Sequence, residues 1–254
     1  NAHTHLALTA LEKVVPTGDF TRWLRALVNT SRSLTNDDFA ASAAYGALRM
    51  LSAGVTVVGD IAYGPESPAA AGDMGLGGTF FWEVLGLAPD DLPDRLAELE
   101  FPFSGACGKR AECGITPHAP YTSGPELLKV TREAAEIAGS MWAIHIAESV
   151  AEVRLLAGAG GPLTDTANRM AVGFRPPKMS PVAYLDDLGL LDGSIVVHCV
   201  QLGPGDATKL GKTRGVVLCP RSNRVLGNGY PPVPALCDAG CRIALGTDSA
   251  ASNE

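Results

Sequence analysis

Short, continuously apolar runs alternate along this chain with segments of helical spacing. An apolar run of about four to eight residues, ended by polar or glycine-rich positions, is typical of a strand that is buried on both faces. Such runs predict strands over residues 55–60, 79–85, 112–118, 141–148, 194–198, 215–220 and 241–248. The run at 112–118 is the weakest of them, because Gly114 and Pro117 interrupt its pattern.

The segments between these runs carry helix signals. Thr35 stands where it can cap a helix that ends before Gly54, and Ser123 is the expected cap of a helix that has Pro125 in its first turn. Ser180, followed by a proline, starts another helix. Helices are therefore expected over residues 20–27, 36–53, 93–99, 125–138 and 181–188.

Strands that alternate with helices form a parallel sheet covered on both faces. A strand preceding Asn1 would bring the number to eight, and eight such units close most naturally into a (β/α)8 (TIM) barrel. A doubly wound open sheet is the alternative. Because the sequence opens without Met, directly on a functional-looking motif, residues 1–254 are interpreted as a single barrel domain excised from a longer chain, with its first strand truncated.

Polar side chains fall at or just past the carboxyl ends of the predicted strands. These residues are Asp60, Glu83, His118, His145, His198, Asn223 and Asp248. In a barrel the strand ends form one rim around one pocket, whereas an open sheet would spread them along an edge. The pattern favours the barrel and places its chemistry at this rim.

Two histidines stand one residue apart at the beginning of the chain. In an extended backbone His3 and His5 project the same way, because strand side chains alternate with a period of two. With His145 and Asp248 they supply three imidazoles and one carboxylate, a set that suits zinc or ferrous iron with an open position for water. Asp248 can also be read as a helix cap, and the convergence of four candidate ligands favours the metal site.

Glu148 and His198 are the further catalytic candidates. Glu148 follows the His145 strand, where it can carry a proton to a ring nitrogen or a leaving amine, unless it is a surface glutamate that opens the next helix. His198 fits a residue that orients the attacking water, and a fifth ligand is the alternative. Asp248 can accept the proton of that water. No lysine near His118 is available to bridge two metals, which favours a mononuclear site.

Composition narrows the class of partner. The 254 residues carry a net charge of -7 with dispersed lysines and arginines, and no apolar run approaches the ~20 residues of a membrane span. We therefore expect no nucleic-acid or membrane partner and a small-molecule substrate, and the sequence leaves homo-oligomerisation open. The six cysteines are scattered without a Cys-x-x-Cys pair, which predicts buried, reduced thiols and a cytoplasmic protein.

Six motifs that contain these residues occur in order along the whole chain. They are Asn1-Ala2-His3-Thr4-His5-Leu6, Thr116-Pro117-His118-Ala119-Pro120-Tyr121-Thr122, Ile144-His145-Ile146-Ala147-Glu148-Ser149, Val197-His198-Cys199-Val200, Cys219-Pro220-Arg221-Ser222-Asn223 and Leu245-Gly246-Thr247-Asp248-Ser249. Together they resemble the amidohydrolase superfamily, in the branch of cytosine, guanine and adenosylhomocysteine deaminases and triazine chlorohydrolases.

The resemblance implies a (β/α)8 barrel, flanked in relatives by a small β-sandwich that is truncated here. It also implies one divalent metal per chain, usually zinc, held by His3, His5, His145 and Asp248. By the same resemblance Glu148 is the proton shuttle, His198 contacts the attacking water, and His118 and Asn223 lie on the substrate side.

The resemblance further implies hydrolytic deamination of an aminated heterocycle. The region from Gly18 to Leu24 and the motif beginning at Ser180 resemble the aminodeoxyfutalosine deaminases of menaquinone biosynthesis, although those relatives commonly carry Glu where this chain has Ala7. Glu83 is then a candidate contact to the nucleoside, with a buried structural partner as the alternative. The competing functions are another purine or cytosine deaminase, a triazine chlorohydrolase, a binuclear hydrolase and a metal-binding homologue without turnover.

Overall fold

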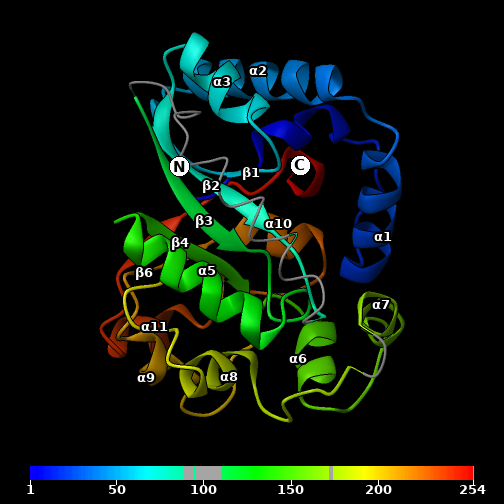
Figure 1. Ribbon diagram of the computed structural model, residues 1–254, viewed down its shortest axis with the longest axis vertical. Coiled ribbons are helices and arrows are strands. Elements are labelled where there is room, and N and C mark those ends of the chain that lie inside the picture. Colours follow the sequence, from blue (N-terminus) through cyan, green and yellow to red (C-terminus); the bar gives the residue numbers. More distant parts are fainter. Residues whose placement is uncertain (89–93, 95–109, 172–173, 254) are drawn as a thin grey trace.

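The computed structural model describes residues 1–88, 94, 110–171 and 174–253. Its seven parallel strands form one sheet in sequence order (Figure 1). The strands are β1 (Val57–Ala62), β2 (Gly77–Val84), β3 (Ala111–Pro117), β4 (Met141–Ile146), β5 (Ile195–His198), β6 (Gly215–Leu218) and β7 (Ile243–Leu245). Each predicted strand is confirmed, with boundaries shifted by a few residues.

Helices cover the outer face of the sheet and connect successive strands, apart from β2 and β3, whose connection lies mostly outside the described residues (Figure 1). The helical segments are η1 (Leu6–Leu11), α1 (Phe20–Ser31), α2 (Asn36–Ser52), α3 (Glu66–Asp73), α5 (Pro125–Ile137), α6 (Val150–Leu156), α7 (Thr164–Met170), α8 (Pro181–Asp187), α9 (Asp206–Leu210), α10 (Pro220–Val225), α11 (Val233–Asp238) and η4 (Ala250–Ser252). The helix expected over residues 93–99 lies almost wholly outside the described residues.

Helix starts follow the expected capping chemistry in two cases out of three. The Thr35 hydroxyl accepts the N–H of Asp38 at 3.2 Å while the Asp38 carboxylate accepts the N–H of Thr35 at 2.8 Å. The Ser180 hydroxyl accepts the N–H of Ala183 at 3.0 Å. The expectation for Ser123 is wrong, because α5 begins after Gly124 and receives no side-chain cap.

Residues 1–4 close the sheet between its first and last strands. The Thr4 N–H donates to the carbonyl of Gly59 at 2.9 Å, and the Asp248 N–H donates to the carbonyl of His3 at 3.0 Å. The N-terminal segment therefore lies between β1 and the end of β7, in the place of the eighth strand. Gly59 permits this approach, since a Cβ there would lie 2.5 Å from the carbonyl oxygen of Ala2.

Alternation along the strands separates an inner layer from an outer layer. Ile61, Phe81 and Ala143 pack together inside the barrel. The residues on either side of Ala143, such as Ile144, join the larger core under the helices. Asp60 also points outward, because its carboxylate accepts the N–H of Leu6 at 2.7 Å on the helix side of β1. Asp60 is thus a buried residue of the outer layer and lies outside the rim pocket.

The cysteines depart from the sequence prediction. Cys199 and Cys219 are free and buried as expected, but Cys113 is disulfide-bonded and Cys237 is exposed. The cysteines therefore give no support to a cytoplasmic location. Among the described helices, none has both the length and the apolar character needed to cross a membrane.

Candidate metal centre

The N-terminal clamp has the geometry that its spacing predicts. His3 and His5 are both buried, and their Nε2 atoms lie 3.2 Å apart. The backbone that carries these two histidines is hydrogen-bonded to β1 along one edge and to Asp248 along the other. Gly246 leaves room for this packing, because a Cβ there would lie 2.7 Å from the Cβ of His3. The two imidazoles thus face one point inside the barrel mouth.

Asp248 faces the same point from the end of β7. Its Oδ1 lies 3.5 Å from His3 Nε2 and 3.4 Å from His5 Nε2. The Ser222 hydroxyl donates to Oδ2 at 2.5 Å, and the Ser249 N–H donates to Oδ1 at 2.8 Å. Burial alone would raise the pKa of Asp248, but the hydrogen bond with His3 and the positive potential of the surrounding imidazoles outweigh it and hold this pKa well below its ordinary value.

His145 completes the predicted ligand set from the inner face of β4. Its ring centroid lies 4.9 Å from that of His3 and 5.5 Å from that of His5. Its Nδ1 lies 2.7 Å from the carbonyl oxygen of His118, an acceptor, so Nδ1 carries the proton and Nε2 keeps its lone pair. Burial, followed by the neighbouring histidines, lowers the pKa of His145 well below its ordinary value. A neutral imidazole with a free Nε2 is what a metal ligand requires.

His198 reaches the cluster by a different backbone route. Regular alternation in β5 would turn it toward the helices, beside Val196, but its φ of +77° turns the side chain back toward the site. Its ring centroid lies 5.8 Å from that of His3, and its Nδ1 is 3.0 Å from Asn223 Oδ1. Burial is the main cause that lowers the pKa of His198 to about 4.

The candidate ligand atoms form overlapping groups that meet at His3. One group is His3, His5 and Asp248, and a second is His3, His145 and His198. Within each group the ligand atoms lie within 4.8 Å of one another. The structure therefore brings all four predicted ligands together, with His198 as a fifth side chain at the same centre.

Glu148 lies beside this centre and is buried, which excludes a surface role for its side chain. Its Oε2 is 3.8 Å from His198 Nε2, and its Oε1 accepts the side-chain N–H of Asn228 at 3.2 Å. Burial is the first cause that raises the pKa of Glu148 well above its ordinary value, and the charges of Asp248 and Glu152 add to it. A raised pKa favours the protonated carboxyl group, which is the form that can act as a proton donor.

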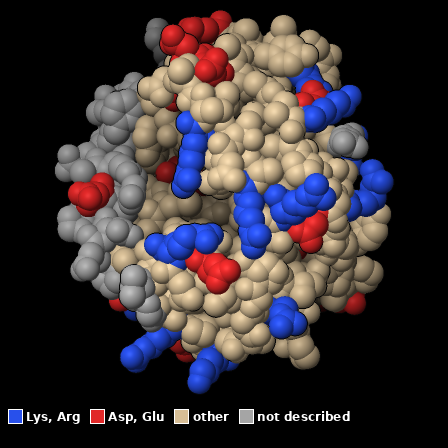
Figure 2. Space-filling view, turned by 90° about the vertical axis from the view of Figure 1, so that its right-hand side faces the viewer, with Lys and Arg blue, Asp and Glu red and all other residues tan. Residues whose placement is uncertain are grey.

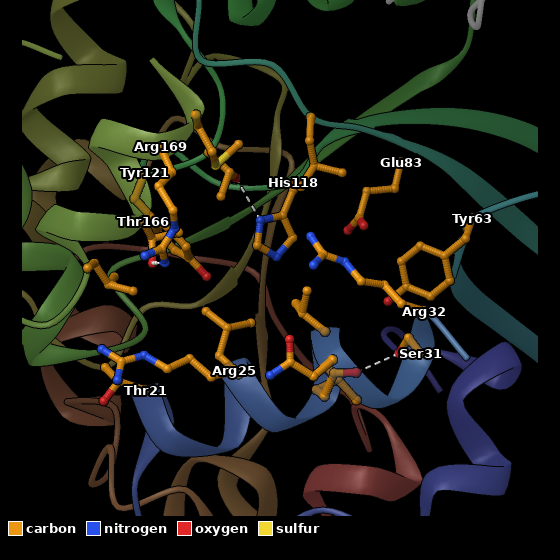
Figure 3. Close-up of a pocket in the computed structure, with 18 of the residues that line it drawn as sticks. Thr21, Arg25, Ser31, Arg32, Tyr63, Glu83, His118, Tyr121, Thr166 and Arg169 are labelled. Atoms are coloured by element: carbon orange, nitrogen blue, oxygen red, sulfur yellow. Dashed lines mark hydrogen bonds between the residues drawn. The ribbon is translucent and has the colours of Figure 1, made fainter. Parts of the chain in front are cut away.

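A cavity of about 900 Å³ opens next to the centre, between α1, α7 and the ends of β1, β2 and β3 (Figure 3). Glu83, His118, Tyr63 and Tyr121 are among the residues that line it, and Glu83 and His118 lie beside His145. Burial raises the pKa of Glu83 to about 8, and its Oε1 has no hydrogen-bond partner among the described residues. An unpaired buried oxygen that faces a cavity can form a hydrogen bond with a bound ligand.

Two predicted substrate contacts have different surroundings. His118 lines the cavity, and its Nδ1 lies 2.7 Å from the hydroxyl of Thr122. Asn223 lies behind His198 on α10 and is not among the residues that line this cavity. The geometry gives Asn223 the position of a residue that orients His198.

Several neighbours of the site escape the sequence analysis. The Tyr63 hydroxyl lies 2.5 Å from His5 Nδ1. The Glu152 carboxylate accepts the backbone N–H groups of Ala147 and Glu148. Ser222 belongs to the motif that runs from Cys219 to Asn223. Glu152 belongs to none of the motifs, and the sequence shows it only as a glutamate four residues after Glu148. Tyr63 has no motif of its own, so only the packing of β1 against the N-terminal segment reveals it.

Comparisons with known proteins agree with this geometry. The model of the amidohydrolase family matches residues 1–254. An aminodeoxyfutalosine deaminase of Deinococcus radiodurans is 35% identical and a 5-methylthioadenosine/S-adenosylhomocysteine deaminase of Archaeoglobus fulgidus 30% identical, each over 100% of this chain. The chain spans 63% and 58% of the length of these two relatives.

A solved structure has the same fold. The zinc-bound adenosine deaminase of Xanthomonas campestris superimposes with a TM-score of 0.81 at 25% identity, over 100% of this chain and 56% of that one. The curled parallel sheet with its outer helices therefore has the barrel architecture of these proteins.

Proposed function

Because the chain belongs to the amidohydrolase family, we propose that it is a metal-dependent deaminase, a hydrolase that acts on a C–N bond of a cyclic amidine and releases ammonia. The substrate class is an aminated purine nucleoside or a related heterocycle. The observation that carries the proposal is the buried Glu148 carboxyl group, 3.8 Å from His198 and beside the ligand cluster. A site that only binds a metal needs no proton donor there.

His3, His5, His145 and Asp248 would hold one divalent ion per chain. Three imidazoles and a carboxylate suit zinc, with ferrous iron as the alternative. The hydrogen bond of His145 Nδ1 to the His118 carbonyl supports this assignment, because it leaves Nε2 free. A divalent ion bound there would activate a water molecule as a nucleophile near neutral pH.

The protein's own side chains divide the proton transfers. Glu148 would donate its proton to the ring nitrogen next to the amine-bearing carbon, which the raised pKa of its carboxyl group supports. Asp248, whose pKa is held low, would accept the proton of the attacking water. His198 would orient that water from Nε2, while Asn223 fixes its ring at Nδ1.

The part of the cavity beside His145 would hold the reacting end of the substrate. Glu83 offers an unpaired oxygen to a hydroxyl or N–H of the ligand, and His118 lies within the same group of ligand atoms as His145. These two residues are therefore the proposed substrate contacts.

Aminodeoxyfutalosine is the best single candidate, because the relative that is 35% identical carries that activity in its name. The relative named for methylthioadenosine and adenosylhomocysteine makes purine nucleosides of that kind the alternative. A cytoplasmic location, a role in menaquinone biosynthesis and the absence of nucleic-acid and membrane partners stay predictions.

Ammonia release from a panel of aminated rings tests the proposal. The protein, loaded with zinc, is offered aminodeoxyfutalosine, adenosylhomocysteine, adenosine, guanine, cytosine and a chlorotriazine. Glu148→Gln is the test variant, and Glu133→Gln, an exposed position on α5, is the matched control.

We expect ammonia from a purine nucleoside, released roughly 10²–10⁴-fold more slowly by Glu148→Gln, which is the typical contribution of general acid catalysis, and at an unchanged rate by Glu133→Gln. Chloride release without ammonia would replace the deaminase by a chlorohydrolase. Zinc binding without release of ammonia or chloride from any of these compounds would contradict the proposed reaction.

A further inference from the structure

The hydroxyl of Tyr63 lies 2.5 Å from His5 Nδ1, and the two rings stack with their centroids 5.9 Å apart. Tyr63 directly follows β1, and the parallel register of the N-terminal segment sets Thr4 beside Asp60. Ile61 packs inside the barrel, and the alternation of strand side chains turns Tyr63, two residues further on, to the same side. The end of β1 therefore places a phenol at the edge of His5 opposite the metal centre.

Apolar packing does not explain why a tyrosine stands at position 63. Its side chain is 39% exposed, and it belongs to none of the apolar clusters that the described residues form. Tyr121, which lines the same cavity, is by contrast buried in the cluster between α1 and α7. The contact with His5 is therefore the interaction that accounts for the hydroxyl of Tyr63.

Tyr63 also lines the cavity of about 900 Å³. This cavity opens on the face that α1 and α7 form, where Figure 2 shows a hollow. A phenol oxygen can accept one hydrogen bond and donate another. The oxygen of Tyr63 can thus accept an N–H from His5 and give its own hydrogen to water or to a ligand in the cavity.

The two nitrogens of His5 decide which direction this hydrogen bond takes. Nε2 lies 3.2 Å from His3 Nε2 and 3.4 Å from Asp248 Oδ1, so it faces the candidate metal centre. If Tyr63 donated to Nδ1, the proton of the neutral imidazole would be on Nε2 and would exclude a metal ion. If Nδ1–H donates to the phenol oxygen, Nε2 keeps its lone pair for the ion. Only the second arrangement is compatible with His5 as a ligand.

His145 has the same arrangement with a different acceptor. Its Nδ1 donates to the carbonyl of His118 at 2.7 Å, which leaves its Nε2 free. Main-chain carbonyls and carboxylates are the usual acceptors for the second nitrogen of a histidine ligand. A side chain takes this part at His5, so a single substitution can remove the acceptor without altering the backbone.

We propose that Tyr63 is a positioning residue for the metal site: its phenol oxygen accepts the Nδ1–H of His5 and fixes the ring and the tautomer in which His5 binds the ion. The inference rests on the metal site of the proposed function, and it adds a residue that none of the six motifs contains. Hydrogen-bond partners of metal ligands typically contribute about 10–100-fold to metal affinity or activity. We expect the contribution of Tyr63 to lie in that range.

Substitution Tyr63→Phe tests the inference, because it removes the hydroxyl and keeps the ring. Tyr45→Phe, at an exposed position on α2, is the matched control. Zinc affinity is measured for each protein by competition with a chelator. Zinc is then replaced by Co²⁺, whose visible absorption bands report the geometry of its ligands, and the melting temperature of the metal-free protein is recorded.

We expect Tyr63→Phe to bind zinc about tenfold or more weakly and to change the intensity or position of the Co²⁺ bands. The metal-free variant should melt close to the wild type, and Tyr45→Phe should match the wild type in all three measurements. A purely structural role for Tyr63 would lower the melting temperature and leave the zinc affinity and the Co²⁺ spectrum of the folded protein unchanged. Wild-type zinc affinity and an unchanged spectrum in Tyr63→Phe would overturn the inference, whatever its melting temperature.

This inference and the proposed function fail in different ways. Weaker zinc binding in Tyr63→Phe without ammonia from any substrate would keep the role of Tyr63 and reject the deaminase. Ammonia release together with an unaffected metal site in Tyr63→Phe would keep the deaminase and reject the role of Tyr63. A wild-type protein that binds neither zinc nor Co²⁺ would reject both.

Discussion

The carboxylate of Glu152 accepts the backbone N–H of Glu148 at 2.8 Å. Its other oxygen accepts the N–H of Ala147 at 3.0 Å, where the backbone has a φ of +51°. Glu152 is fully buried at the start of α6, so these bonds fix the turn that carries Glu148 into the site. The proposed proton donor therefore owes its position to a second glutamate one helical turn away.

Substitution Glu152→Gln should impair turnover through the position of Glu148. The amide has one acceptor oxygen and sets an N–H₂ group against a backbone N–H, which leaves a buried donor unpaired at a cost of about 1–3 kcal/mol. We expect kcat to fall about tenfold or more with KM nearly unchanged, and the melting temperature to drop. Steady-state kinetics and calorimetry measure both. Equal kcat in Glu152→Gln and in the exposed Glu133→Gln would show that this turn does not depend on Glu152.

Substitution Ser222→Ala should weaken metal binding without removing a ligand. The Ser222 hydroxyl donates to Asp248 Oδ2 at 2.5 Å, so its loss frees the carboxylate to rotate. Partners of this kind typically contribute about 10–100-fold to metal affinity or activity. Zinc affinity, measured by competition with a chelator, should fall by about tenfold, while the exposed Ser33→Ala should retain it. Unchanged zinc affinity in Ser222→Ala would show either that Asp248 is not a ligand or that its orientation does not depend on Ser222.

Substitution Gly246→Ala should displace His3. The new methyl group would lie 2.7 Å from the His3 Cβ and 2.9 Å from its carbonyl oxygen, so the N-terminal segment must move. Overpacking of this kind costs about 1–3 kcal/mol. Urea unfolding should show this loss, and zinc affinity should fall with it. Gly72→Ala is the control, because its methyl group would meet no atom within 4 Å and helical alanine is favoured over glycine. A stable Gly246→Ala protein with full zinc affinity would contradict the tight packing of His3.

Asp60 should make the stability of the protein depend on pH. Burial is the first cause that raises the pKa of its carboxyl group from 3.8 to about 7, while its bonds from Leu6 and Ser67 oppose the shift. Between these two values the unfolded chain has lost the proton and the folded chain keeps it, so the free energy of unfolding falls as pH rises. Above about pH 7 both states are ionised and the loss is complete.

Substitution Asp60→Asn removes this titration. The free energy of unfolding of the variant should therefore increase relative to that of the wild type as pH rises. The difference in free energy of unfolding between variant and wild type should change in favour of the variant by up to about 1.4 kcal/mol per pH unit between pH 4 and 7, and then level off. Urea unfolding at a series of pH values measures it, with the exposed Asp187→Asn as the matched variant. A difference that is constant over this range would mean that Asp60 is ionised in the folded protein throughout.

The apolar runs of the sequence predicted the strands and their parallel sheet, and the structure gave the order of the strands. Each run buries its residues on both faces, so only a parallel sheet between helices satisfies it. The same alternation placed His145 on the inner face of β4, and the spacing of His3 and His5 placed both imidazoles on one side of an extended segment. These residues could be predicted because local periodicity alone fixes the direction of their side chains.

Tertiary structure decided what local periodicity cannot reach. His198 would point outward by alternation and reaches the centre only through its φ of +77°, while Asp60, at an equally suggestive strand end, points outward and joins the helix layer. Tyr63 and His5 are 58 positions apart, and nothing in the sequence relates them until β1 packs against the N-terminal segment. The sequence by itself therefore predicted the barrel and the residues that we propose as metal ligands, and for His3, His5 and His145 the direction of the side chain follows from strand geometry. The packing of helices and the turns after the strands decided which other side chains join them, because those contacts arise between elements that are distant in the chain.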